Sequence, residues 1–197
     1  MKMIDAMGKA CPLPVIQTRK ALKETTETLC VEVDNEIATQ NLTKMAEQLG
    51  LSAQTKKVAE RHYQVTIART EGDAANEVAP VETEEVLLPK IVVIGSDQMG
   101  SGDTELGETL LRNFLFACSE QEAFPTAILF YNRGAFLTTA RSKSLQDLQK
   151  MAAAGTWIAT CGICLDFYGL TEELAVGEIT NMYRIVELMQ QYPVIEP

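Results

Sequence analysis

Apolar and polar positions follow two periods along the first 70 residues, and each period predicts one kind of element. Two segments repeat apolar residues every three or four positions, which is typical of amphipathic helices, and the second stops before Gly50, a suitable helix terminator. Apolar runs or strict alternation predict strands elsewhere. We predict helices over residues 12–23 and 38–49, and strands over residues 3–6, 29–33, 52–58 and 61–69. The order β-α-β-α-β-β predicts an α/β two-layer sandwich.

From residue 90 onward, strands again alternate with helices. The first strand, Ile91-Val92-Val93-Ile94, is apolar throughout, as in parallel strands that are covered on both faces. Asp103 suits the N-cap of the helix that follows. The apolar stripe of that helix is predicted to comprise Leu106, Leu110, Phe114, Leu115 and Cys118. Further strands are predicted over residues 127–131, 157–160 and 194–195, and helices over residues 144–154 and 182–189. This pattern predicts an open, mostly parallel α/β sheet with its ligand site beyond the carboxyl ends of the strands.

Residues 71–89 separate the two patterns and have the composition of a linker. They contain six acidic residues, two prolines, no lysine or arginine, and no sustained helical or strand period. We therefore predict one domain over residues 1–70, an acidic linker over residues 71–89, and a second domain over residues 90–197.

Charge and composition exclude several classes of protein. The net charge is −10, and only residues 1–70 are slightly basic, at +2, which argues against binding to nucleic acid phosphates. No apolar stretch approaches the ~20 residues that span a bilayer, and no apolar secretory segment follows the N-terminus. We expect a cytoplasmic protein without a membrane segment, in which an odd number of cysteines, five, does not form a disulfide framework.

Cys11 is the first candidate for chemistry, in the sequence Cys11-Pro12-Leu13-Pro14. If Pro12 is the first helical residue, Cys11 becomes the N-cap and its sulfur faces the backbone N–H of Leu13. Pro14 has no N–H to offer. The positive end of a helix favours a thiolate, which is the nucleophilic form of cysteine. The alternative is that Cys11 only fills the cap position or packs against the sheet.

Cys161 and Cys164 form the second candidate, a Cys-x-x-Cys pair directly after a predicted strand. Such a pair serves as a redox dithiol, as half of a zinc site, or as a nucleophile with a resolving partner. Zinc is disfavoured because no second such pair exists and the one histidine, His62, lies in the other domain. The motif also follows its strand through a glycine and does not open an obvious helix. The alternative is two buried thiols, and we assign Cys30 and Cys118 to the core in the same way.

Polar and glycine residues after other predicted strands are candidate binding residues. Asp97, Asn132 and the loop over residues 100–103, with Gly100 and Gly102, are expected to line the same crevice as Cys161 and Gly162. Backbone N–H groups there would bind an anion. The alternative is that these glycines only turn the chain. We expect no metal ion and no cofactor.

The segment Asp5-Ala6-Met7-Gly8-Lys9-Ala10-Cys11-Pro12-Leu13-Pro14 resembles the TusA/SirA family of small sulfur-carrier proteins. Residues 15–22 and the segment from Val33-Asp34-Asn35 to Leu49 match as well, so the resemblance covers residues 1–70. Lys9 departs from the leucine that is usual in the family. The resemblance implies that Cys11 carries a persulfide and that Pro12, Leu13 and Pro14 shape its turn.

The second domain resembles the DsrE-like domain of the YedF family, which joins a TusA-like domain to a DsrE-like domain. The motifs that carry this resemblance lie in residues 94–97, 99–103, 131–134, 161–169 and 176–183. The resemblance implies a sulfurtransferase-like protein of selenium metabolism that assembles as a homo-oligomer.

Three hypotheses of function follow from these observations. In the first, Cys11 accepts sulfur or selenium from a persulfide donor such as a cysteine desulfurase and passes it to Cys161, to Cys164 or to an acceptor protein. In the second, the protein is an adaptor or regulator without turnover. In the third, Cys161 and Cys164 act as a redox dithiol.

Overall fold

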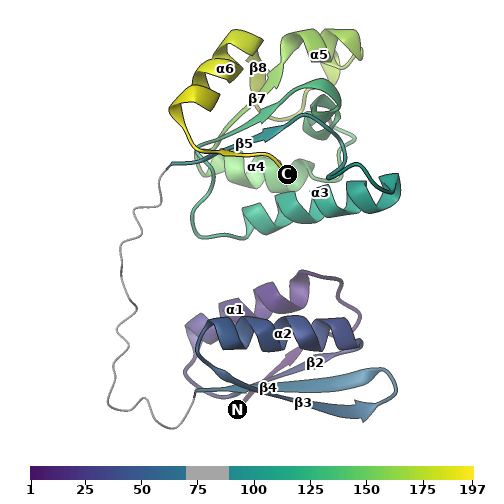
Figure 1. The fold of residues 1–197 in the computed structure, drawn as a ribbon, viewed down its shortest axis with the longest axis vertical. Coiled ribbons are helices and arrows are strands. Elements are labelled where there is room, and N and C mark those ends of the chain that lie inside the picture. Colours follow the sequence, from purple (N-terminus) through teal and green to yellow (C-terminus); the bar gives the residue numbers. More distant parts are fainter. Residues whose placement is uncertain (70–88) are drawn as a thin grey trace. The chain divides into compact units, whose positions relative to one another are not determined.

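The chain divides into two compact units, and the computed structural model describes residues 1–69 and 89–197 (Figure 1). The division, between Glu82 and Thr83, falls among the residues that are not described. Apart from Pro89, the predicted linker over residues 71–89 therefore lies outside the described residues.

The first unit is a four-stranded sheet with two helices on one face (Figure 1). Its elements are β1 (Lys2–Asp5), α1 (Leu13–Glu24), β2 (Leu29–Val33), α2 (Glu36–Gln48), β3 (Ser52–Ala59) and β4 (His62–Ala68). The strand order is β1-β2-β4-β3, with β1 parallel to β2 and the other two pairs antiparallel. The predicted two-layer α/β sandwich is confirmed.

The two ends of α2 explain its length. Asn35 Oδ1 accepts the backbone N–H of Ala38 at 2.8 Å, which satisfies one of the unpaired donors of the first turn. Gly50 has a φ of +69° just beyond the helix, and the N–H of Leu51 reaches back to the carbonyl of Ala46 at 2.9 Å. Between these ends, the fully buried Leu42 fixes the helix against the sheet.

The second unit is built on a five-stranded sheet in which every paired strand is parallel. Its elements are β5 (Ile91–Ile94), α3 (Thr104–Ser119), β6 (Ala127–Phe130), the 3₁₀ segment η1 (Asn132–Thr138), α4 (Leu145–Ala153), β7 (Trp157–Cys161), α5 (Gly162–Phe167), η2 (Thr171–Glu173), β8 (Glu178–Thr180), α6 (Met182–Gln191) and β9 (Val194–Ile195). The strand order β8-β7-β6-β5-β9 places the last strand of the unit beside the first. The predicted open parallel α/β sheet is confirmed.

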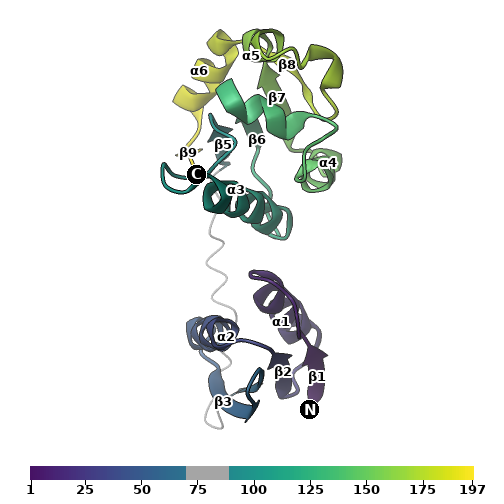
Figure 2. The ribbon, with the colours of Figure 1, turned by 90° about the vertical axis from the view of Figure 1, so that its right-hand side faces the viewer.

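Helices cover both faces of this sheet (Figure 2). Side chains of α3 and α4 pack with Val92 and Ile94 on one face, and α6 packs with Ile91 and Val93 on the other. Because β8 and β9 lie at opposite edges, α6 carries the chain from one edge of the sheet to the other. No helix within residues 1–69 or 89–197 is long and apolar enough to cross a membrane.

The predicted apolar stripe of α3 is wrong at two positions. Leu106 and Leu110 are exposed, whereas Leu111 and Leu115 are buried. The reason is Gly107, which lies so close to the loop after β5 that an added Cβ would be 2.9 Å from the Cβ of Gln98. This contact turns Gly107 toward the protein and the neighbouring Leu106 outward. Periodicity alone did not predict η1, α5 or β8.

Candidate functional site

Cys11 is exposed, and it does not cap α1. The N-cap is Pro12 and the first helical residue is Leu13, so the prediction of Cys11 as the N-cap is wrong by one residue. The physical reason is a turn before the helix. The N–H of Leu13 donates to the carbonyl of Ala10 at 3.0 Å and is therefore not directed at the sulfur of Cys11.

The surroundings of Cys11 come from α1 and from the first turns of α2. Asn41 Nδ2 lies 4.0 Å from Cys11 Sγ, at the limit of a hydrogen bond to sulfur. The ammonium group of Lys9 donates to the carbonyl of Asp5 and to Gln17 Oε1, each at 2.9 Å. A shallow pocket beside the thiol is lined by Lys9, Cys11, Pro12, Pro14, Val15, Asn35, Ile37, Ala38 and Asn41.

This arrangement suits a thiol that meets a partner at the surface. Cys11 is accessible, and the exposed apolar side chain of Ile37 stands at the same pocket. Pro12 and Pro14 line the same pocket as the thiol, while Leu13 begins the helix. An exposed cysteine with an adjacent apolar rim offers both a nucleophile and a contact surface.

In the second unit, Cys161 and Cys164 lie where β7 passes into α5. Cys161 is the last residue of β7 and the N-cap of α5, and Cys164 is the third residue of that helix. The expectation that this motif opens no helix is therefore wrong. Gly162 makes the tight passage possible, because an added Cβ would lie 2.9 Å from Ile179 Cγ2 on the neighbouring β8.

The two thiols differ in exposure. Cys161 is 2% exposed and belongs to the core that α6 covers, whereas Cys164 is half-buried. Burial raises the pKa of the Cys164 thiol, an N–H from Asn132 opposes that shift, and a hydrogen bond with Cys161 raises the pKa further. Cys164 is the accessible thiol of the pair.

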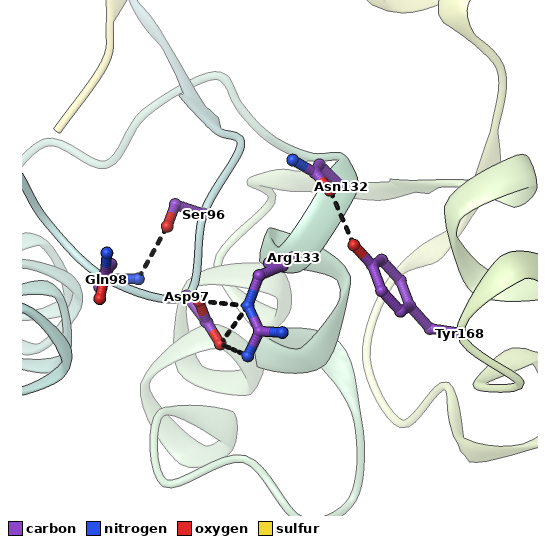
Figure 3. Close-up of polar contacts among 6 residues, drawn as sticks. All are labelled: Ser96, Asp97, Gln98, Asn132, Arg133 and Tyr168. Atoms are coloured by element: carbon purple, nitrogen blue, oxygen red, sulfur yellow. Dashed lines mark hydrogen bonds and ion pairs between the residues drawn. The ribbon is translucent and has the colours of Figure 1, made fainter. Parts of the chain in front are cut away.

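Asn132 follows β6 and brings its backbone to Cys164. Its N–H donates to Cys164 Sγ at 3.0 Å. Its Oδ1 accepts a hydrogen bond from Tyr168 Oη at 2.8 Å (Figure 3). Asn132 has a φ of +49°, a left-handed conformation that asparagine tolerates better than most residues. The structure thus brings the predicted residue Asn132 to the dithiol.

Asp97 lies after β5 and pairs with Arg133, the residue that follows Asn132 (Figure 3). Both carboxylate oxygens of Asp97 accept from Arg133 Nε at 2.9 Å, and Arg133 Nη2 also contacts Oδ2. These hydrogen bonds hold the pKa of Asp97 below its usual range. Asp97 therefore holds the loop that carries Asn132.

Gly100 and Gly102 lie in the exposed loop between β5 and α3. A Cβ added at either position would meet no atom within 4 Å. An anion-binding role for Gly100 and Gly102 stays a prediction.

The other cysteines are core residues. Cys30 is 4% exposed in β2, and burial raises the pKa of Cys118 to about 11. Across residues 1–69 and 89–197, no cluster of three or more His, Cys, Asp or Glu side chains could hold a metal ion.

Arg133 and Tyr168 also belong to this site, and neither was predicted as a site residue. Arg133 has a signal in the sequence, since it follows a strand end and is adjacent to the predicted Asn132. Tyr168 has none, because its contact with Asn132 joins residues 36 positions apart.

Comparisons with known proteins show the family of the first unit. The model of the family described as "Sulfurtransferase TusA" matches residues 2–69. The "Putative sulfur carrier protein MJ0990" of Methanocaldococcus jannaschii is 34% identical over 71 residues, which cover 35% of this chain and 95% of that protein.

Two solved structures are each similar to part of the chain. The SirA-like protein DSY4693 from Desulfitobacterium hafniense is 44% identical, with a TM-score of 0.33, and the match covers 34% of this chain and 95% of that one. The ychN protein from E. coli is 17% identical, with a TM-score of 0.44, and the match covers 56% of this chain and all of that one.

Proposed function

The chain belongs to the TusA sulfurtransferase family through its N-terminal unit, and from this premise we propose that Cys11 carries sulfur as a persulfide. The observation that carries the proposal is the position of Cys11, an exposed thiol beside an apolar pocket in the segment that the family model matches. An exposed thiol is open both to a protein that donates sulfur and to one that accepts it.

Loading of Cys11 exchanges one sulfur–sulfur bond for another. The Cys11 thiolate attacks the outer sulfur of a donor persulfide, such as that of a cysteine desulfurase. The new bond to Cys11 forms as the sulfur–sulfur bond of the donor breaks, and the donor leaves as a thiolate. The transferred sulfur keeps its oxidation state, so the step needs no cofactor.

The second unit provides candidate acceptors in this proposal. Cys11 passes its sulfur to Cys161, to Cys164 or to an external acceptor protein, in a cytoplasmic protein that assembles as a homo-oligomer. If the second unit is DsrE-like and the whole chain YedF-like, the delivered atom is sulfur or selenium in selenium metabolism. Asp97, Gly100, Gly102, Asn132 and Gly162 are the proposed binding residues of this unit.

Intact mass spectrometry tests the carrier proposal. The reduced protein is incubated with a cysteine desulfurase and cysteine, and Cys11→Ser is compared with Cys161→Ser and Cys164→Ser. The expected result is one added sulfur atom that only Cys11→Ser loses. If the added sulfur is lost only with Cys161→Ser or Cys164→Ser, loading takes place in the second unit. If no form carries an added sulfur, the carrier mechanism with that donor is refuted, and a role as adaptor or regulator is left.

A further inference from the structure

We propose that the second unit reduces persulfide sulfur to sulfide, with Cys164 as the thiol that takes up the sulfur and Cys161 as the thiol that resolves it. This inference rests on the proposed function only for the identity of the donor, because any persulfide that reaches Cys164 would serve. It assigns different tasks to two cysteines that the sequence motif leaves equivalent.

Accessibility decides which thiol takes up sulfur. A thiol accepts sulfur by approaching the outer sulfur of a donor, so it must be reachable from outside the protein. Cys161 is 2% exposed and packs in the core with Ala159, Ile185 and Leu188. Cys164 is half-buried and lies at the carboxyl edge of the sheet, one turn further along α5. Only Cys164 is open to a donor.

Contacts from another segment of the chain support the same assignment. The N–H of Asn132, from the end of β6, is directed at Cys164 Sγ at 3.0 Å. A hydrogen bond to sulfur favours the thiolate and opposes the effect of burial. Tyr168 Oη donates to Asn132 Oδ1 at 2.8 Å and so stabilises a left-handed backbone conformation that few residues other than glycine and asparagine adopt. Asn132 and Tyr168 are positioning residues for Cys164.

Cys161 is placed to react with a persulfide on Cys164. Cys161 is the N-cap of α5 and Cys164 is its third residue, so the two cysteines lie about one helical turn apart, and the core shields Cys161 from external thiols and oxidants. A sheltered thiol next to an accessible one is the arrangement of a resolving cysteine, which reacts within the molecule at a high effective concentration.

Sulfide release takes two steps. Cys164 thiolate attacks the outer sulfur of a donor persulfide, and the donor leaves as a thiolate. Cys161 then attacks Cys164 Sγ, so that the bond between the two cysteines forms as the bond from Cys164 Sγ to the outer sulfur breaks. The outer sulfur leaves as sulfide and takes the proton of Cys161. It is reduced by two electrons while the cysteines are oxidised to a disulfide, which a dithiol reductant opens again.

The test uses the full chain with Cys11→Ser, so that loading through Cys11 plays no part. Equimolar glutathione persulfide is the sulfur donor, because it leaves as a thiol and releases no sulfide itself, and sulfide release, intact mass and free thiols are measured. In the Cys11→Ser background we expect about one sulfide per chain and an internal disulfide. Adding Cys161→Ser should retain one extra sulfur atom and release no sulfide, and adding Cys164→Ser should abolish both.

Other outcomes would overturn the inference. Retention of sulfur by the Cys164→Ser form and its loss from the Cys161→Ser form would reverse the two tasks. A persulfide that persists when both cysteines are present would mean storage without release. Failure of Cys11 loading by a desulfurase refutes the carrier proposal and leaves this test unaffected.

Tyr168→Phe tests the positioning role without removing the ring that packs 5.0 Å from the ring of Phe136. Loss of one hydrogen bond should slow the alkylation of Cys164 by about fivefold at neutral pH and move its pH profile upward. The matched control is Tyr183→Phe, at a tyrosine that is 83% exposed, which should leave the rate unchanged. Equal rates for the two variants would refute the positioning role of Tyr168.

Discussion

Gly134→Ala should destabilise the second unit, because Gly134 lies against the end of β5. A Cβ at this position would lie 2.2 Å from the carbonyl oxygen of Ile94 and 3.0 Å from its carbonyl carbon. An ordinary contact begins at 3.4 Å, so the two backbone segments would have to separate by more than 1 Å. The same carbonyl oxygen accepts the N–H of Tyr131 at 3.1 Å, which leaves it little freedom to move.

The expected loss is at the upper end of the range for overpacking, about 3 kcal/mol, because the clash is with backbone and no flexible side chain can yield. The lower entropy of the unfolded alanine chain offsets only about 0.4–1 kcal/mol of this. With a urea m-value of about 1–3 kcal/mol/M, the unfolding midpoint should fall by roughly 1–2 M.

Urea unfolding followed by tryptophan fluorescence measures this loss, since the one tryptophan, Trp157, lies in the second unit. Gly102→Ala is the matched control, because a Cβ there meets nothing within 4 Å and its backbone is not left-handed. Its midpoint should equal that of the wild type or exceed it slightly. If Gly134→Ala and Gly102→Ala unfold at the same urea concentration, the argument from the close approach is wrong.

Three further predictions concern the two cores and one helix end. Leu42→Ala should lower the free energy of unfolding of the first unit by about 2–5 kcal/mol, since Leu42 is fully buried. Circular dichroism during denaturation measures this loss, and a loss below about 1 kcal/mol would contradict the packing of Leu42. Asn35→Ala removes the cap of α2 and should lower the free energy of unfolding by about 1 kcal/mol in the same assay. The control Gln40→Ala, on the exposed side of that helix, should be nearly neutral, and equal losses in the two variants would argue against the cap. Burial raises the pKa of Cys118 to about 11, so the unfolded thiol ionises first and the free energy of unfolding of the second unit falls between about pH 9 and pH 11. The fall should be at most about 2 kcal/mol, after allowance for partial exposure, and should shrink in Cys118→Ala; an unchanged fall in that variant would refute the assignment to Cys118.

The sequence predicted the elements whose pattern is regular over several residues. The strands over residues 29–33 and 91–94 match β2 and β5 residue for residue, because apolar side chains fill these central strands. The cap Asp103 was also correct, and its Oδ1 accepts the N–H of Leu106 at 2.9 Å. Such elements depend on neighbouring residues and not on contacts between residues far apart in the sequence.

The site was predicted less completely because its geometry depends on contacts between residues far apart in the sequence. Cys11 was expected to cap α1, but the carbonyl of Ala10 takes the N–H that the cap would have used. The helix α5 has only six residues and starts at a glycine, so no period marks it. Asn132 was chosen for its place after a strand, yet its N–H on Cys164 depends on a left-handed backbone and on Tyr168.

The path of α6 sets the order in which the two units are completed during synthesis. The first unit has all its strands once Ala68 has left the ribosome, whereas one face of the second sheet stays bare until α6 follows. At about 5–20 residues per second, residues 69–195 take roughly 6–25 s to be added. From their own addition until that of α6, Ile91 and Val93 lack their cover, so an apolar face of the nascent second unit is exposed at a stage when the first unit already has all its strands.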